Sequence, residues 1–393
     1  MSKCTILIGG DLCPTSQNVD LFNDGQIDIL FGEIKDEIVN ADYSIVNLEC
    51  PIIKDNTPVE KIGPVLDTNE SCAKMLKKLK IDTVCLANNH ILDHGKNGFD
   101  NTLKVLEENG ISYVGVGKNL REASKMLEVN IKNKKIGILA MSEHEFYTAS
   151  DTEFGTNPLD VINIVNIFNE NKKKFDYIVT LIHGGVEHFQ YPSPRMQRIS
   201  RFIIEQGGGC VIWQHSHCPG YIERYRDSYI VYGQGNLLFD IGNQKNMLWH
   251  QGYLIKLQID NEAADIDLIP YLQSFNSHGV HKLSDKEAKV FNMSIFNKVV
   301  DMNNTNYIKE IWNKYCMEKR SWYIGEITGY ARIVNRLNIS SSSFLNHLLF
   351  KIFNINKQLL LKYRNLLICE SQFDVIENSI DLYLKEKIRN KNG

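Results

Sequence analysis

The sequence predicts a layered α/β protein, and three observations lead to this fold class. Short apolar runs rich in β-branched residues recur between residues 4 and 234, separated by longer helix-like segments. Most of these runs are continuous rather than alternating, which is typical of strands buried on both faces. Metal-capable polar residues stand at or just past the ends of five of the runs. Alternating strands and helices favour a layered α/β domain, and 393 residues allow one large domain plus an appendage.

The expected elements follow in chain order. The predicted strands cover residues 4–10, 43–49, 82–88, 135–141, 177–183, 209–215 and 228–234. The predicted helices between them include residues 70–80, 98–110 and 193–208. The last two helical segments end in glycine, as helix C-termini often do.

The composition changes near residue 285. Strand-like runs fade beyond it, and Asn, Lys, Ile and Leu dominate segments such as 343–367 and 373–391. We therefore expect a domain of residues 1–285 and a mostly helical C-terminal appendage of residues 286–393. A helical cap or a homo-oligomer surface is the first expectation for this appendage. Its apolar and basic composition leaves a contact with a membrane surface or a partner protein as the alternative.

The net charge, the cysteine pattern and the lengths of the apolar runs limit the expected partners and the expected cellular compartment. A formal net charge of −3 gives no electrostatic reason to expect a nucleic-acid partner. Nine cysteines contain no CxxC pair and show no disulfide framework, so we expect reduced thiols and a cytoplasmic protein. The first apolar run is too short for a signal peptide, and no stretch approaches the ~18 apolar residues that cross a bilayer. The inner face of the membrane is the alternative location.

The candidate metal ligands share one position relative to the predicted strands. Ligand sites in open α/β sheets form at the carboxyl ends of strands, and five runs deliver polar residues there. These residues are Asp11, Glu49, Asn89 with His90, His183, and His215 with His217. Such a mixed nitrogen and oxygen set suits Mn, Zn or Fe(II) better than Ca. Two metals that share a carboxylate can activate water and clamp the attacking and leaving oxygens.

Each of these residues alone also has an ordinary structural explanation. A carboxylate after a strand is often a cap or a loop charge, and asparagine favours helix N-caps. A lone histidine after a strand is more often structural, and an HxH pair arises by chance in many chains. The combination favours a metal site. Within it, His90 is a candidate general acid or base because histidine is the side chain that most often serves in that role, and Asp93 is close enough in sequence to orient it.

The order of the motifs resembles the bacterial capsule-synthesis CapA (poly-γ-glutamate-type) family, a branch of the calcineurin-like metallophosphoesterases. The resemblance spans residues 4–275 and does not cover the C-terminal segment. The motifs are Gly-Gly-Asp11, Asn-Leu-Glu49, Ala-Asn-Asn89-His90-x-x-Asp93-x-Gly95, His183-Gly-Gly-x-Glu187, His215-Ser-His217 and Tyr-Gly-x-Gly-Asn236-Leu-Leu-Phe-Asp240.

The resemblance implies a layered α/β/β/α sandwich of metallophosphoesterase type and assigns roles within it. Glu49 is the implied bridging carboxylate, His90 the catalytic acid and Asp93 its orienting partner. The implied metal ligands are Asp11, Glu49, Asn89, His183, His215 and His217. Expected substrate contacts are Asn88, Glu187, His188 and Asn236.

The first motif departs from the wider superfamily. That superfamily has Asp-x-His where this sequence has Asp11-Leu12-Cys13, which weakens one of the two expected metal sites. Cys13 is either a thiolate ligand or, as we favour, a packing residue.

The expected function is metal-dependent hydrolysis, with one or two divalent transition metals (Mn, Zn or Fe) as cofactor. A phosphate ester on a small molecule or polymer precursor of a capsule or cell-surface polysaccharide is the favoured substrate. The alternatives are cleavage or transfer at γ-glutamyl amide bonds, and a non-catalytic role in capsule assembly. The presence of both His90 and Asp93 favours an enzyme.

Overall fold

The computed structural model describes residues 3–15, 18–61, 63–145, 147–241, 244–260, 263–275 and 277–328, with residues 344, 345, 348, 351 and 360 beyond them. The chain divides into two compact units, Met1–Trp312 and Asn313–Gly393. Segment 373–391, predicted to be helical, lies outside the described residues, as does most of 343–367.

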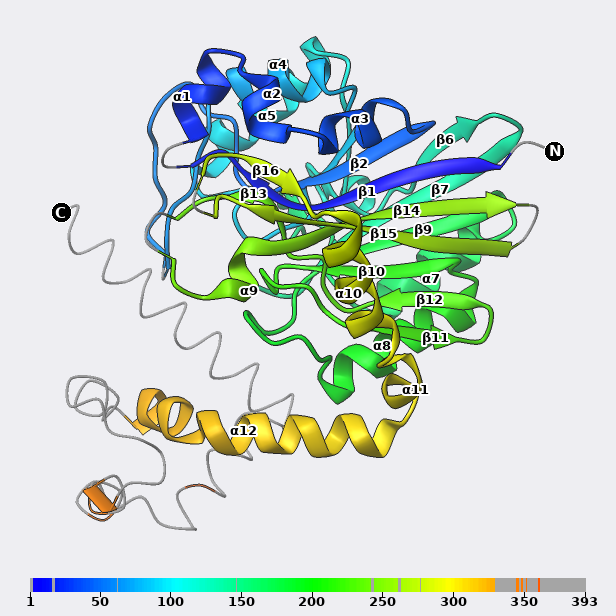
Figure 1. The fold of residues 1–393 in the computed structure, drawn as a ribbon. Helices are drawn as coiled ribbons and strands as arrows, with labels where there is room; N and C mark the ends of the chain where they lie inside the picture. Colours follow the sequence, from blue (N-terminus) through cyan, green and yellow to red (C-terminus); the bar gives the residue numbers. More distant parts are fainter. Residues whose placement is uncertain are drawn as a thin grey trace. The chain divides into compact units, whose positions relative to one another are not determined.

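Two β-sheets form the centre of the first unit, with their strands running across the view of Figure 1. The larger sheet has the order β16 (Val280–Lys282), β15 (Ala263–Gln273), β14 (Gln251–Asp260), β1 (Cys4–Cys13), β2 (Tyr43–Leu48), β3 (Thr83–Cys85) and β4 (Ser112–Val114), and β13 (Asn236–Phe239) also pairs with β1. The second sheet has the order β11 (Ile222–Tyr225), β12 (Ser228–Val231), β10 (Cys210–Gln214), β9 (Tyr177–His183), β7 (Lys134–Ser142) and β6 (Leu127–Ile131). A separate pair joins β5 (Val116–Gly117) and β8 (Gly155–Thr156).

The strands that carry the candidate residues are parallel members of these sheets. β1 to β4 pair in parallel in the larger sheet, and β7, β9, β10 and β12 do so in the second. All seven predicted strands are present. Because parallel strands point the same way, their carboxyl ends meet at one edge of each sheet.

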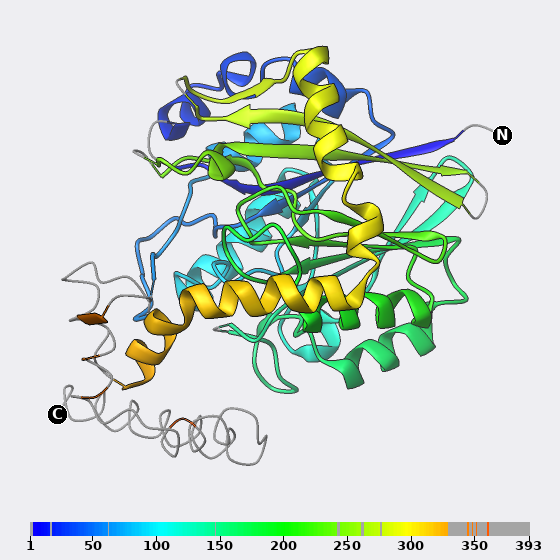
Figure 2. The same ribbon diagram turned by 60° about the horizontal axis from the view of Figure 1, so that its bottom comes forward.

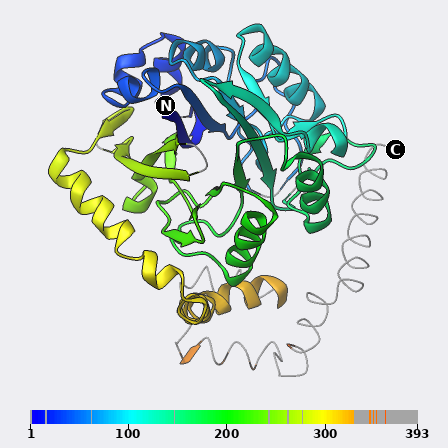
Figure 3. The ribbon, with the colours of Figure 1, turned by 90° about the vertical axis from the view of Figure 1, so that its right-hand side faces the viewer.

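Three apolar clusters define the layers. One lies between the two sheets and joins Ile6, Ile8 and Ile45 of the larger sheet to Val179 and Leu181 of the second. A second cluster lies between the larger sheet and α1 (Asn18–Asn23), α2 (Ile27–Phe31), α3 (Ile34–Val39), α4 (Ser71–Lys78) and α5 (Gly95–Glu108). A third lies between the second sheet and α7 (Val161–Asn171) and α8 (Pro194–Gln206). Figure 3, seen nearly along the strands, shows these helices outside the sheets. The α/β/β/α arrangement is thereby confirmed.

Helix α8 illustrates why the sequence sets these bounds. Ser193 accepts a hydrogen bond from the backbone N–H of Met196, and Pro194 occupies the first turn, where its missing N–H costs nothing. The helix ends at Gly207, whose φ of 115° lies in the left-handed region that glycine adopts freely. The predicted segment 193–208 matches this helix closely. Two further short helices, α6 (Leu120–Ala123) and α9 (Met247–His250), occur in connections.

The first unit continues past residue 285. Helix α10 (Asp285–Phe296) begins with a capping box between Ser284 and Glu287. It packs on β15, where the Asn292 side chain donates to the carbonyl of Leu268 at 3.1 Å, and Figure 2 shows it in yellow. Helix α11 (Val299–Met302) and the start of α12 (Thr305–Thr328) follow. The first unit therefore includes α10 and α11, which the sequence analysis assigned to the appendage. Within the described residues, no helix has the length and apolar character needed to span a bilayer.

Candidate metal centre and acid–base pair

Donor atoms from three loops converge on the side chain of His183, the last residue of β9. Its Nε2 lies 3.3 Å from Oε1 of Glu49, 3.0 Å from Oδ1 of Asn89 and 3.1 Å from Nδ1 of His215. Glu49 follows β2, Asn89 follows β3 and His215 follows β10. Ligand atoms of a tetrahedral metal site with bonds of ~2.0–2.2 Å lie ~3.3–3.6 Å apart. The contact between His183 and Glu49 falls in this range, and the contacts of His183 with Asn89 and His215 are slightly shorter.

Glu49 is the least satisfied group in the site. Its side chain is fully buried, and neither carboxylate oxygen has a hydrogen-bond partner among the residues that the structure describes. Burial raises the pKa of Glu49 to about 8, and the nearby carboxylate of Asp11 adds to the effect. An unpartnered buried carboxylate is costly, and a cation between Glu49 and its neighbours would remove that cost.

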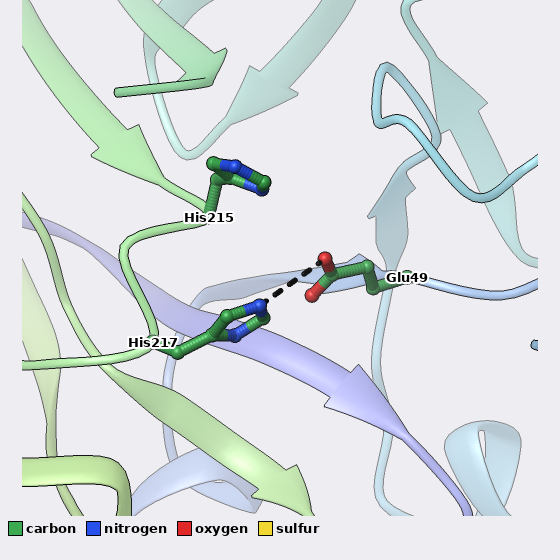
Figure 4. A group of neighbouring side chains, drawn as sticks. All are labelled: Glu49, His215 and His217. Atoms are coloured by element: carbon green, nitrogen blue, oxygen red, sulfur yellow. Dashed lines mark ion pairs between the residues drawn. The ribbon is translucent and has the colours of Figure 1, made fainter. Parts of the chain in front are cut away.

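A second part of the site contains Asp11 and His217. Nδ1 of His217 lies 3.6 Å from Oδ2 of Asp11, and Nε2 lies 3.8 Å from Oε1 of Glu49. Figure 4 shows the contact with Glu49 as a dashed line, with His215 on the same loop. One ligand atom from each of Glu49, His215 and His217 lies within 4.8 Å of the others. Glu49 therefore lies between the two parts, as a bridging carboxylate must.

Neighbouring amides hold Asp11 and His217 in place. Parallel pairing of β13 with β1 places Asn236 beside Asp11, and Oδ1 of Asn236 lies 2.8 Å from Nδ1 of His217. Nδ2 of Asn47 donates to Asp11 at 2.8 Å and lies 3.2 Å from Nδ1 of His183. The backbone N–H of His215 donates to Asp11 at 3.0 Å. Such outer contacts orient metal ligands.

The histidines differ in electrostatic environment. Burial lowers the pKa of His183 to about 4 and that of His215 well below its ordinary value. Burial also acts to lower the pKa of His217, but the carboxylates of Glu49 and Asp11 outweigh it and raise the pKa. His183 and His215 are therefore neutral at pH 7, which is the form that binds metals.

The loop after β10 has an unusual backbone. His215 and His217 have φ values of 92° and 49°, in the left-handed region that non-glycine residues rarely adopt. Such residues cost about 1–3 kcal/mol each and cluster at functional sites. Packing holds the His217 ring as well, since its centroid lies 4.7 Å from that of Trp249 at an interplanar angle of 41°.

The predicted acid–base pair is formed beside this cluster. Nδ1 of His90 lies 2.7 Å from Oδ2 of Asp93, and both side chains are buried. Oδ2 of Asp93 also accepts from the backbone N–H of Leu66 at 2.7 Å, while Oδ1 contacts Nζ of Lys61 at 2.5 Å. No hydrogen bond to Nε2 of His90 occurs within the described part of the chain.

The four expected substrate contacts fall into two groups. Asn88 is buried, and its amide is occupied by Asn47, by the carbonyl of Leu48 and by two backbone N–H groups. Asn236 is buried too and orients His217. These two residues therefore shape the site from within, because neither side chain faces solvent. Glu187 and His188 are exposed, with His188 5.7 Å from the Trp249 ring, which leaves them at the rim where a substrate can reach.

Four residues of the site escaped the sequence analysis. Asn47 stands within the Asn-Leu-Glu49 motif, so its position carried a signal. Glu145 follows the predicted strand 135–141, so its position carried a signal too. Trp249 and Lys61 did not, because they belong to segments without a strand-end motif. Glu145 is exposed; its Oε2 accepts from Asn89 at 3.2 Å and lies 4.0 Å from Nε2 of His215.

Cys13 lies outside the donor set. It is fully buried in the apolar cluster between the larger sheet and α1–α5, and burial raises the pKa of its thiol. Cys13 thus packs as a small apolar residue. The eight cysteines in the described part of the chain are all free thiols.

Two solved structures to which this chain is similar are titled as a phosphatase and a 5′-nucleotidase. A phosphatase from Mycoplasma pneumoniae is 12% identical with a TM-score of 0.46, over 75% of this chain and 99% of that one. A 5′-nucleotidase from Candida albicans is 10% identical with a TM-score of 0.39, over 68% of this chain and 51% of that one.

Two curated relatives are named for capsule or PGA biosynthesis. The capsule biosynthesis protein CapA of Bacillus anthracis is 25% identical over 68% of this chain and 67% of its own length. The PGA biosynthesis protein CapA of Bacillus subtilis is 27% identical over 55% of this chain and 58% of its own. The chain thus spans only part of these relatives. The model of the bacterial capsule synthesis protein PGA_cap matches residues 5–241, more than half of the chain, so the protein belongs to this family, as its motifs predicted.

Proposed function

We propose that this protein is a metal-dependent hydrolase that cleaves a phosphate ester during synthesis of a bacterial capsule or cell-surface polymer. The observation that carries the proposal is the buried carboxylate of Glu49, which has no hydrogen-bond partner among the described residues and lies close to His183, His215 and His217. A protein without a ligand for this site would keep a costly unsatisfied group in its core. The donor set supports Mn, Zn or Fe(II) as the cation.

Different residues of the site would have different roles. Glu49, Asn89, His183 and His215 would hold one cation, and Asp11 and His217 would complete a second site with Glu49. A bound divalent metal supplies Lewis acidity and lowers the pKa of water. Asn47 and Asn236 keep Asp11 and His217 oriented by their amide contacts. The loss of a superfamily histidine at Cys13 leaves the Asp11 and His217 part with fewer protein ligands.

His90 supplies the proton for the leaving group in this proposal. Asp93 accepts from Nδ1 of His90, which directs the other ring nitrogen, Nε2, away from the carboxylate. The Nε2 proton then passes to the oxygen that leaves phosphorus, a contribution of ~10²–10⁴-fold for a well-placed general acid. The exposed rim residues Glu187 and His188 are proposed to contact the remainder of the substrate.

The proposed role in polymer synthesis is supported by the names of the relatives, which mention capsule and PGA biosynthesis. These names leave γ-glutamyl amide chemistry as the second candidate, because the same cation site can polarise an amide carbonyl. The buried His90–Asp93 pair favours a reaction in which an oxygen or nitrogen leaving group needs a proton.

Hydrolysis of aryl phosphate monoesters and diesters tests the proposal. The full chain is reconstituted in turn with Mn, Zn and Fe(II), with His90→Ala as the control variant. We expect metal-dependent turnover that falls in the variant while its metal content stays the same. Full metal occupancy without turnover of any ester would contradict phosphoesterase activity and favour γ-glutamyl substrates.

A further inference from the structure

Lys61 reaches the acid–base pair from a loop far from it in sequence. It lies in the connection between β2 and α4, and its side chain is 2% exposed. Its Nζ contacts Oδ1 of Asp93 at 2.5 Å and lies 3.4 Å from Nδ1 of His90. It also donates to the backbone carbonyl of Asn89 at 3.3 Å. Burial of an ammonium group costs free energy of desolvation, so the position of Lys61 beside this pair needs an explanation.

Attachment of the loop alone does not supply that reason. The backbone N–H of Val59 donates to the carbonyl of Asp93 at 2.9 Å. Thr57 adds two contacts to His94, one from its N–H to Nδ1 and one from its hydroxyl to the carbonyl, each 3.0 Å long. These neutral contacts fix the loop without any charge. What Lys61 adds is a fixed partner for the otherwise free oxygen of Asp93.

We propose that Lys61 is a positioning residue for the general acid His90, an inference that rests on the proposed function. Lys61 and the N–H of Leu66 hold the two oxygens of Asp93 so that Oδ2 faces His90. A carboxylate only accepts hydrogen bonds, so the fixed Asp93 selects the His90 tautomer with its proton on Nδ1. When His90 is protonated, the transferable proton is then the one on Nε2. The buried Lys61 side chain does not touch substrate and acts through Asp93.

Leaving-group dependence tests this role in Lys61→Met, an apolar replacement of similar length. Loss of general-acid function harms esters with poor, alkoxide-type leaving groups more than activated aryl esters. We expect kcat for an alkyl ester to fall about 10–100-fold, with a much smaller change for a nitrophenyl ester and little change in KM. Metal content should stay at the wild-type value. Adding His90→Ala to Lys61→Met should cost little beyond His90→Ala alone.

Thr57→Val is the matched control, because it removes one loop contact without touching Asp93. It should leave the ratio of alkyl to aryl turnover unchanged. A Lys61→Met variant that loses both activities equally, or that multiplies the effect of His90→Ala, would overturn the positioning role.

Histidine ¹⁵N NMR of the full chain reports the His90 tautomer directly and needs no measurement of activity. It therefore tests the role of Lys61 separately from the proposed function. His90→Gln assigns the signals of His90. We expect wild type to show one His90 tautomer with its proton on Nδ1, and Lys61→Met to show a mixture. An unchanged tautomer in Lys61→Met would overturn the inference, even if the wild-type chain hydrolysed no phosphate ester.

Discussion

The Glu49 cluster and the His90–Asp93 pair lie on neighbouring strand-end loops but are satisfied in different ways. Both oxygens of Asp93 have protein partners, and the pair is complete within the chain. Both oxygens of Glu49 have no hydrogen-bond partner in the described part of the chain, although His183 and His217 lie close to the carboxylate. The pair is thus preorganised by the protein, whereas the cluster, on the proposed function, needs a cation to satisfy its carboxylate. Substitutions in the two regions should separate metal binding from catalysis.

The largest effect is expected for His183→Ala. It removes the nitrogen on which three other donor atoms converge, so metal should be lost along with activity. Because a catalytic metal contributes several kcal/mol, kcat/KM should fall by more than ~10³-fold. Elemental analysis and ester hydrolysis check this result. The exposed His188→Ala is the control and should keep its metal; equal metal content in both variants would show that the ligands are wrongly assigned.

His90→Ala should sharpen the contrast between the two regions. The pair contacts the metal cluster only through its neighbours, so metal content should remain at the wild-type value. Turnover of esters with poor leaving groups should fall by ~10²–10⁴-fold because the proton donor is gone. Steady-state kinetics at saturating metal measure this change. An unimpaired variant would remove His90 from the mechanism.

Asn236→Ala is expected to have a smaller effect on the metal. It removes the acceptor that orients His217, while the packing of His217 against Trp249 remains. Loss of such an outer contact weakens metal affinity by roughly 10–100-fold. Competition with a chelator measures the affinity, and Asn101→Ala on α5 provides a matched control. Wild-type affinity in Asn236→Ala would show that the amide does not support the ligand.

The smallest effect is a pH dependence of stability in the metal-free protein. The pKa of Glu49 is raised to about 8 in the folded chain, so the folded state holds a proton that the unfolded state has lost. This contribution is complete below pH ~4.5 and disappears as pH rises through 8. His183 and His215 have lowered pKa values, so they oppose this slope where the unfolded chain's histidines still bind protons, near and below their ordinary pKa of 6.5. This opposition is weak above about pH 7.

Urea unfolding should therefore show the free energy of unfolding of the metal-free chain falling by about 1 kcal/mol between pH 7 and 8. Glu49→Gln cannot ionise and should lose most of this slope; the residual would come from His217, whose raised pKa acts in the same direction. Saturation with metal should also flatten it, since the cation replaces the proton. An identical slope in Glu49→Gln would exclude Glu49 as its source.

The sequence predicted the strands and the residues at their ends well, because both signals are local. A continuous apolar run specifies a buried strand, and the polar residue after it occupies the edge where parallel strands end. His183 and His215 come together because β9 and β10 are neighbouring parallel strands. Glu49 joins them because the larger sheet packs on the second sheet, which no local sequence pattern specifies. The short helices α1, α2 and α3 were not predicted, since five or six residues are too few to show a helical period.

What the sequence could not show is how distant segments turn toward the site. Lys61 comes from a loop without periodicity, and its contact with Asp93 exists only because that loop folds back on the start of α5. Asn236 reaches His217 because β13 pairs with β1, a partner more than two hundred residues away in the chain. Asn88 sits next to Asn89, yet it turns inward to bind backbone groups. Side-chain direction in such loops is set by tertiary contacts rather than by motif spacing.

Metal analysis of the full chain tests the central claim most directly. The protein is reconstituted separately with Mn, Zn and Fe(II), desalted, and compared with Glu49→Gln by plasma mass spectrometry. The account predicts at least one tightly held metal per wild-type chain with one of these cations, and a clear loss in the variant. A wild-type chain that retains none of the three metals would contradict the assignment of Glu49 and its neighbours as a metal centre.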